Sequence, residues 1–114
     1  MDRKVTKNER ILLSLLEEYA GERHAAQTDM RSIVLADREK KQFQVVTMGW
    51  YEGEFFFNVM FHFEIKPDGK IWLIQNSSDV PIAEELAERG VPKSEIVLGF
   101  QPEKMRRVSG FAVV

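Results

Sequence analysis

Apolar residues near the start of the chain recur with the period of an α-helix. They form one stripe on an otherwise charged segment, consisting of Ile11, Leu12, Leu15, Leu16 and Tyr19. Thr6 and Glu9 have the spacing of a capping box, in which each side chain bonds a free amide at the start of a helix. The pattern predicts a helix over residues 6–20 that ends at Gly21, and then a loop over residues 22–30.

The middle of the chain changes to a period of two. Every second position is apolar over one long stretch, at Phe55, Phe57, Val59, Phe61, Phe63 and Ile65. A regular strand directs such residues to one face, so we expect all six in the core. Together with shorter apolar runs and turn residues, the pattern predicts strands at residues 31–37, 42–48, 54–66 and 70–76.

The turn at residues 67–69 sets the register of the last two of these strands. A three-residue loop would place Ile65 opposite Ile71 and Phe63 opposite Leu73 on the core face. The second face would then pair Glu64 with Trp72, His62 with Ile74, and Met60 with Asn76. This second face mixes apolar and polar side chains, so we expect another helix of the chain or a partner to cover part of it.

The last third of the chain predicts a second helix and two more strands. Asp79 and Pro81 have the positions of a helix cap and a first-turn proline, so a helix is expected near residues 80–89. The remaining segments are strands at 96–98 and 111–114, with a helical turn or loop at 102–109. The order of elements predicts an α+β fold over residues 1–114, with the two helices packed on a mainly antiparallel sheet.

The composition of the chain excludes several kinds of functional site. The 114 residues include no Cys, which excludes disulfides and thiolate metal sites and fits a reducing compartment. No apolar run is long enough for a membrane span, so a cytoplasmic protein is expected. The two histidines, His24 and His62, have no helical pairing, and the glycines match no nucleotide-binding motif, so neither metal nor cofactor is expected.

Two functions that use single clusters of residues stay open at this point. A small hydrolase could be arranged from Ser77 or Ser78 as nucleophile, His62 as base and Asp79 as acid, although no nucleophile elbow surrounds the serines. Sixteen Lys and Arg against eighteen Asp and Glu give a net charge of −2, which is unlike a dedicated DNA-binding protein. A local DNA contact would use the basic cluster of Lys104, Arg106 and Arg107.

The second half of the chain resembles the XisI family, the fdxN element excision controlling factors found mainly in cyanobacteria. The ordered segments that carry the resemblance are Met48-Gly49-Trp50, Phe61-His62-Phe63-Glu64-Ile65-Lys66, Asp68-Gly69-Lys70-Ile71-Trp72, Ile74-Gln75-Asn76, Ile82-Ala83-Glu84-Glu85-Leu86, Gly90-Val91-Pro92-Lys93, Ile96-Val97-Leu98-Gly99-Phe100 with Pro102, and Phe111-Ala112-Val113. The helix segment Leu16-Glu17-Glu18-Tyr19-Ala20 is also similar, so the likeness covers nearly the whole chain. Gln101 stands where many members have a His, so a function of that His would be missing here.

This resemblance implies a non-enzymatic accessory role in heterocyst differentiation, where a recombinase excises a DNA element. It also implies a partner, namely a XisH-like companion protein, the recombinase complex or both, and self-association of the chain stays open. The residues expected to bind the partner are Trp50, His62, Trp72, Asn76 and Asp79. Direct DNA contact through the basic cluster is the alternative, and the hydrolase is the third reading.

Overall fold

One sheet and its covering helices make up the computed structural model, which describes residues 3–22 and 28–113. The strands are β1 (Gly21–Glu22), β2 (Arg31–Asp37), β3 (Gln42–Tyr51), β4 (Glu54–Ile65), β5 (Ile71–Asn76) and β6 (Ile96–Leu98). The helices are α1 (Arg3–Tyr19), α2 (Ile82–Glu88) and α3 (Glu103–Arg106), with the 3₁₀ turn η1 (Lys93–Glu95) before β6. The six strands lie side by side in chain order, and only β5 and β6 run parallel.

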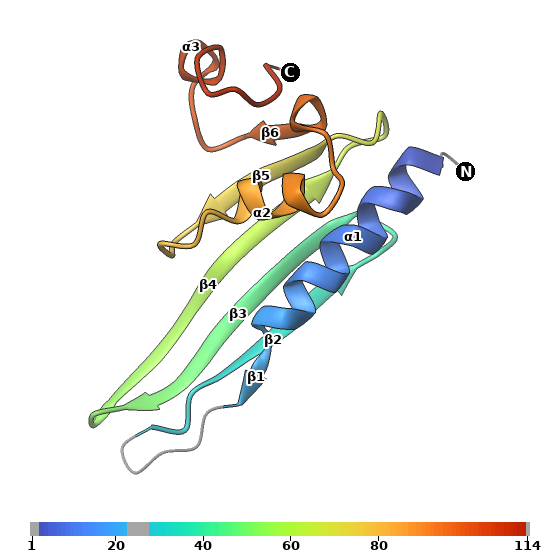
Figure 1. Ribbon diagram of the computed structural model, residues 1–114. Coiled ribbons are helices and arrows are strands. Elements are labelled where there is room, and N and C mark those ends of the chain that lie inside the picture. Colours follow the sequence, from blue (N-terminus) through green and yellow to red (C-terminus); the bar gives the residue numbers. More distant parts are fainter. Residues whose placement is uncertain (1–2, 23–27, 114) are drawn as a thin grey trace.

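The two longer helices cover the same face of the sheet (Figure 1). The core between the helices and the sheet contains fully buried side chains from α1, β3, β4 and α2, among them Leu12, Leu15, Leu16, Phe43, Phe61, Phe63, Ile82 and Leu86. The amphipathic stripe of the first helix is therefore confirmed as a core stripe. The α+β class and the mainly antiparallel sheet are also confirmed.

The predicted capping box at Thr6 is wrong, because α1 begins before it. Val5 belongs to the core, so the apolar stripe and the helix extend back at least to Arg3. Thr6 consequently lies inside the helix. Gly21, predicted as the C-cap, is instead the first residue of β1, which pairs with β2.

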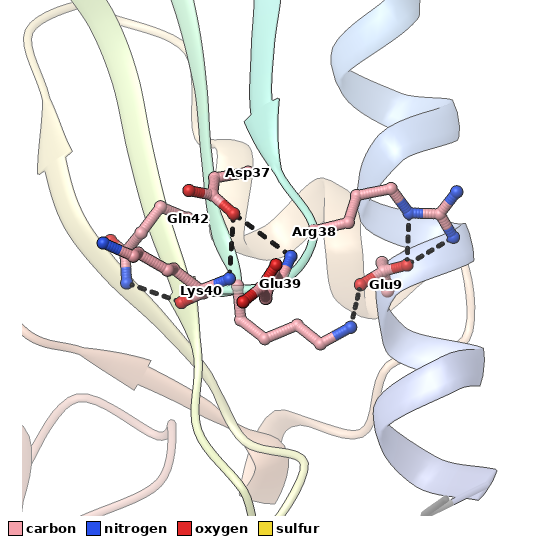
Figure 2. Close-up of polar contacts among 7 residues, drawn as sticks. Glu9, Asp37, Arg38, Glu39, Lys40 and Gln42 are labelled. Carbon is pink, nitrogen blue, oxygen red and sulfur yellow. Dashed lines mark hydrogen bonds and ion pairs between the residues drawn. The ribbon is translucent and has the colours of Figure 1, made fainter.

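Glu9 has a tertiary partner in place of a capping role. Its carboxylate is almost fully buried and accepts hydrogen bonds from Arg38 Nε at 2.8 Å and Lys41 Nζ at 2.7 Å (Figure 2). Both cations come from the turn between β2 and β3. Asp37 shapes that turn by accepting a bond from the Lys40 amide at 2.9 Å. The ion pairs thus fasten the β2–β3 turn to the first helix.

The predicted register of β4 and β5 is correct at the turn and wrong beyond it. Ile65 pairs with Ile71, and Phe63 with Leu73, as expected. A bulge at Ile74 then shifts the pairing. His62 therefore faces Gln75 rather than Ile74, and Asn76 faces Phe61 rather than Met60.

A second bulge lies within β4 itself. Val45 of β3 pairs with Phe61, but the next residue, Val46, pairs with Val59, so Met60 is an extra residue in the strand. The extra residue reverses the alternation of side chains along β4. The expectation that six alternate residues share one face is therefore wrong. The residues Phe61, Phe63 and Ile65 are buried under the helices, whereas Phe55 and Phe57 point to the opposite face and are exposed.

The start of α2 also differs from the prediction. The helix begins at Ile82 and has Pro81 at its N-cap position, with no side-chain cap, so Asp79 does not cap it. The predicted strand at residues 111–114 is wrong within the described residues. There, only Ala112 forms a bridge, to Val97.

Candidate functional site

The sheet has a second face that α1 and α2 do not cover, which we name the open face. Strand pairing assigns it alternate residues of β2 to β5, namely Ile33, Leu35, Gln42, Gln44, Val46, Met48, Trp50, Phe55, Phe57, Val59, His62, Glu64 and Trp72. Leu35 lies on β2 at the margin of this face, beyond the two residues that β1 pairs, and is 45% exposed. Among the described residues no helix lies over β2 and β3 on this side. The face is therefore a broad, partly apolar surface in contact with solvent.

His62 occupies the polar part of the open face. Its Nδ1 lies 3.1 Å from Gln44 Oε1, and its Nε2 lies 2.9 Å from Gln42 Oε1. These residues, with Leu35 and Asp37, line a shallow hollow of about 280 Å³. The side-chain amides of the two glutamines thus hold the imidazole ring in one orientation beside a shallow surface depression.

Trp50 lies at the far end of the open face, on the hairpin formed by β3 and β4. Its side chain is 54% exposed and packs edge-on against Phe55, with 5.4 Å between ring centroids. The Asp29 carboxylate accepts a bond from the Trp50 amide at 2.6 Å, and the Asp29 amide donates to the Trp50 carbonyl. A hollow of about 440 Å³ beside these residues is lined further by Arg31 and Met48. Asp29 therefore fixes the backbone of Trp50, while the aromatic ring is left accessible.

Trp72 lies at the other end of the open face, and the chain partly covers it. Lys66 Nζ and the Arg106 guanidinium lie 5.2 Å and 5.5 Å from its ring centroid, in cation–π geometry. The Arg106 side chain therefore packs against the Trp72 ring. Arg107 forms an ion pair with Glu103 at 3.2 Å, whereas Lys104 is exposed. The three cations proposed for DNA contact thus have three different environments.

The other two residues expected in the partner site lie at the turn after β5. Asn76 Nδ2 donates to the Val80 carbonyl at 2.8 Å, and its Oδ1 accepts from the Ser78 amide and hydroxyl. Asn76 is therefore engaged in shaping this turn, and its strand partner Phe61 faces the core. Asp79 is exposed in the same turn. The structure brings Trp50, His62 and Trp72 onto the open face, but not this pair.

The geometry does not assemble the nucleophile and base of a hydrolase. No hydrogen bond among the described residues joins His62 to Ser77, Ser78 or Asp79. Both His62 nitrogens face glutamine oxygens, and the Ser78 hydroxyl donates to Asn76 and accepts from the Val80 amide.

Within residues 3–22 and 28–113, no group of three or more His, Asp or Glu side chains could hold a metal ion. His24 lies outside the described residues. None of the helices in the described part of the chain is both long and apolar enough to cross a membrane.

Sequence reasoning missed several contributors to the open face, among them Phe55, Phe57 and Leu35. Phe55 and Phe57 were expected in the core, and the sequence has no signal that marks Met60 as the extra residue. Leu35 lies in a strand with apolar residues on both faces, so its orientation follows only from its pairing with Gln44.

The fold is a small α+β domain in which one face of the sheet is not covered by the described helices. The model of the XisI protein family matches residues 1–113. The crystal structure of an XisI-like protein from Anabaena variabilis is 33% identical and covers 96% of this chain and 99% of its own, with a TM-score of 0.81. This chain belongs to the XisI family.

A second crystal structure supports the fold. The fdxN element excision controlling factor XisI from Anabaena variabilis is 21% identical to this chain and superposes with a TM-score of 0.71. The alignment covers 97% of this chain and 99% of that protein. A search of curated proteins found no match.

Proposed function

We propose that this chain is a non-enzymatic controlling factor for the excision of a DNA element by a site-specific recombinase, and that it acts by binding a XisH-like companion through the open face. Membership of the XisI family supports the controlling role, because a structural relative is named as an excision controlling factor. The observation that carries the contact is the exposure of large apolar side chains on an uncovered sheet face. Leu35 is 45% exposed, Trp50 54% and Phe57 64%.

The composition of this face suits a protein partner. Protein interfaces have an apolar and aromatic centre with polar groups that orient the partner. On the open face, His62 with Gln42 and Gln44 provides fixed hydrogen-bonding groups beside the apolar Leu35. Among residues 3–22 and 28–113, no hydrogen-bonded carboxylate–base–nucleophile set accompanies them, so this part of the face supports binding better than turnover.

The test is co-purification of the chain with a XisH-like protein, followed by light scattering to measure the mass of the complex. Leu35→Lys places a charge on an exposed apolar position of the open face, beside His62, and should weaken the complex by roughly tenfold or more. His62→Ala should weaken it as well. The matched control is Ser14→Lys, because Ser14 is exposed on α1, on the other side of the sheet, and should leave affinity unchanged.

Each variant must keep the circular dichroism spectrum and unfolding midpoint of a folded chain. The proposal fails if the chain and the companion do not associate at micromolar concentrations, or if Leu35→Lys and Ser14→Lys bind equally well. Binding to element-end DNA that is steeply salt-dependent and is lost when Lys104, Arg106 and Arg107 are changed to Ala would favour direct DNA contact instead.

A further inference from the structure

The outer half of β4 has an unpaired edge. β3 pairs with β4 along its whole length, whereas β5 pairs only with residues 61–65 (Figure 1). The carbonyls of Val59 and Met60 accept bonds from Ser77. For residues 54–58, no described hydrogen bond reaches the backbone from the side away from β3. About half of the N–H and C=O groups in this stretch therefore point to solvent, because antiparallel pairing uses alternate residues.

The side chains along this edge are aromatic and exposed. Phe55, Phe56 and Phe57 are 58%, 42% and 64% exposed, and the neighbouring Trp50 and Tyr51 of β3 are 54% and 47% exposed. A fully accessible aromatic side chain offers roughly 150–250 Å², so these five together expose on the order of 500 Å². A stable protein interface buries about 800 Å² on each partner. The exposed area of these five side chains is more than half of that figure, although only the three phenylalanines lie on the edge strand itself.

The charge of Glu54 is the one protective feature along residues 54–58 of this edge. Sheets usually shield an exposed strand with a lysine, a proline or a bulge, because a free edge is a template for another strand. Residues 54–58 read Glu-Phe-Phe-Phe-Asn and contain none of these. The bulge at Met60 lies beyond the segment, where Ser77 already occupies the edge. The backbone edge of residues 54–58 is therefore open to pairing with another strand.

We propose that two copies of the chain associate edge to edge through residues 54–58, as antiparallel strands around a two-fold axis at Phe56. In this register Phe56 lies opposite Phe56 of the second copy, and Phe55 lies opposite Phe57. Glu54 then lies opposite the Asn58 amide rather than another carboxylate. Moving the axis by one residue in either direction would place a phenylalanine opposite Glu54 or Asn58, so this register is the one that is self-complementary.

Both faces of the joined sheet gain contacts. Opposed residues in an antiparallel pair share a face, so Phe55 and Phe57 extend the aromatic row of Trp50 into the second copy on the open face. On the other face, a hollow of about 310 Å³ beside Phe56 is lined by Thr47, Asn58 and Met60, among others, and has room for Phe56 of the second copy. The two six-stranded sheets become continuous.

The first test is the mass of the chain alone in solution, which does not depend on any companion. Light scattering at about 100 µM should give twice the mass of one chain. Phe56→Lys places two lysines opposite each other at the axis and should give a folded monomer, because Phe56 is exposed in the single chain. Leu35→Lys, which tests the companion face, should remain dimeric. A monomeric wild type, or a Phe56→Lys variant that stays dimeric, would overturn the proposal.

The second test fixes the register and uses the lack of Cys in the chain. Directly opposed residues have Cα atoms about 4.5–5.5 Å apart, within the range of a disulfide. Phe56→Cys should therefore form a cross-linked dimer under mild oxidation. In Phe57→Cys the two thiols lie two positions out of line, about 8 Å apart between Cα atoms, and should cross-link much more slowly. Equal cross-linking of the two variants would contradict the register and the two-fold axis.

Discussion

Phe57 and Phe61 lie on opposite faces of β4, although four positions separate them. Phe61 is fully buried under α1, and Phe57 is 64% exposed on the open face. The extra residue between them, Met60, reverses the side-chain alternation. One bulge thus divides a continuous aromatic strand into a core segment and a surface segment.

Truncation of these two phenylalanines should have unequal effects on stability. Phe61→Ala should lower the free energy of unfolding by about 3–5 kcal/mol, because it leaves a cavity in the core. Phe57→Ala should change it by no more than about 0.5 kcal/mol in dilute protein. Urea unfolding of both variants measures the difference. Similar costs for the two would show that β4 continues without a bulge.

The buried carboxylate of Glu9 should make the fold sensitive to acid. Burial raises the pKa of this carboxyl, but hydrogen bonds from Lys41 and Arg38 and the charges of both outweigh burial and hold the pKa below its ordinary value of 4.5. Because the folded pKa is the lower one, the stabilisation is present above about pH 4.5 and is lost as the pH falls through the folded value.

Glu9→Gln should therefore cost about 1–2 kcal/mol at pH 7 and should flatten the loss of stability in acid. The estimate lies at the low end for a buried pair because the Arg38 side chain is 69% exposed. Chemical denaturation from pH 3 to 7 is the measurement. Glu17→Gln, an exposed residue on the same helix, is the control and should retain the acid dependence.

Tyr19 joins the two main helices through a hydrogen bond that should be visible at alkaline pH. Its hydroxyl donates to Glu85 Oε1 at 2.6 Å, and this bond, with burial and the charge of Glu85, raises the pKa of Tyr19 to about 12. Since the folded pKa is the higher one, the stabilisation is complete below about pH 10 and is lost as the pH rises toward 12.

Ultraviolet titration of the phenols tests this assignment. The chain has two tyrosines, so Tyr19→Phe should remove the late-titrating phenol and leave Tyr51. Glu85→Gln should move the Tyr19 titration to lower pH, because the carboxylate charge is gone. A late phenol that persists in Tyr19→Phe would refute the assignment.

Gly49 allows residues 29 and 30 to cross close to the β3–β4 hairpin. Its φ is +134°, and an added Cβ would lie 2.8 Å from the Asp29 carbonyl oxygen and 2.9 Å from Met30 Cα. Gly49→Ala should therefore lower the free energy of unfolding by roughly 2–4 kcal/mol and weaken the two hydrogen bonds between Asp29 and the Trp50 backbone. Gly53→Ala, which has φ +81° and open space around it, should cost only about 1 kcal/mol. Equal costs would mean that the close approach does not exist.

Periodicity and turn chemistry were sufficient for the class and the order of most elements, and for the β4–β5 register near the turn. They failed at the bulges. The alternation from Phe55 to Ile65 is unbroken in the sequence, and Met60 becomes the extra residue only through pairing with β3. Register beyond a turn depends on such long-range contacts, so local patterns could not supply it.

The candidate site shows the same limit. His62 and Trp72 lie on the expected face because both are between the β4–β5 turn and the bulges, and Trp50 shares that face because β3 has no extra residue. Asn76 was misplaced because the bulge at Ile74 turned it toward the loop before α2, where it bonds Val80 and Ser78. The partners of Glu9, Arg38 and Lys41, lie about thirty positions away in the sequence. The spacing of Thr6 and Glu9 matched a capping box, so Glu9 was assigned a local role instead.

The central claim is that the open face is what makes the chain a controlling factor, and excision in cells tests it most directly. Cyanobacterial cells that carry the element but lack their own XisI protein would receive wild type, Leu35→Lys or Ser14→Lys, and the frequency of the excised junction would be measured during differentiation. Wild type and Ser14→Lys should restore excision, and Leu35→Lys, although folded, should not. Full excision with Leu35→Lys, or none with wild type, would contradict the account.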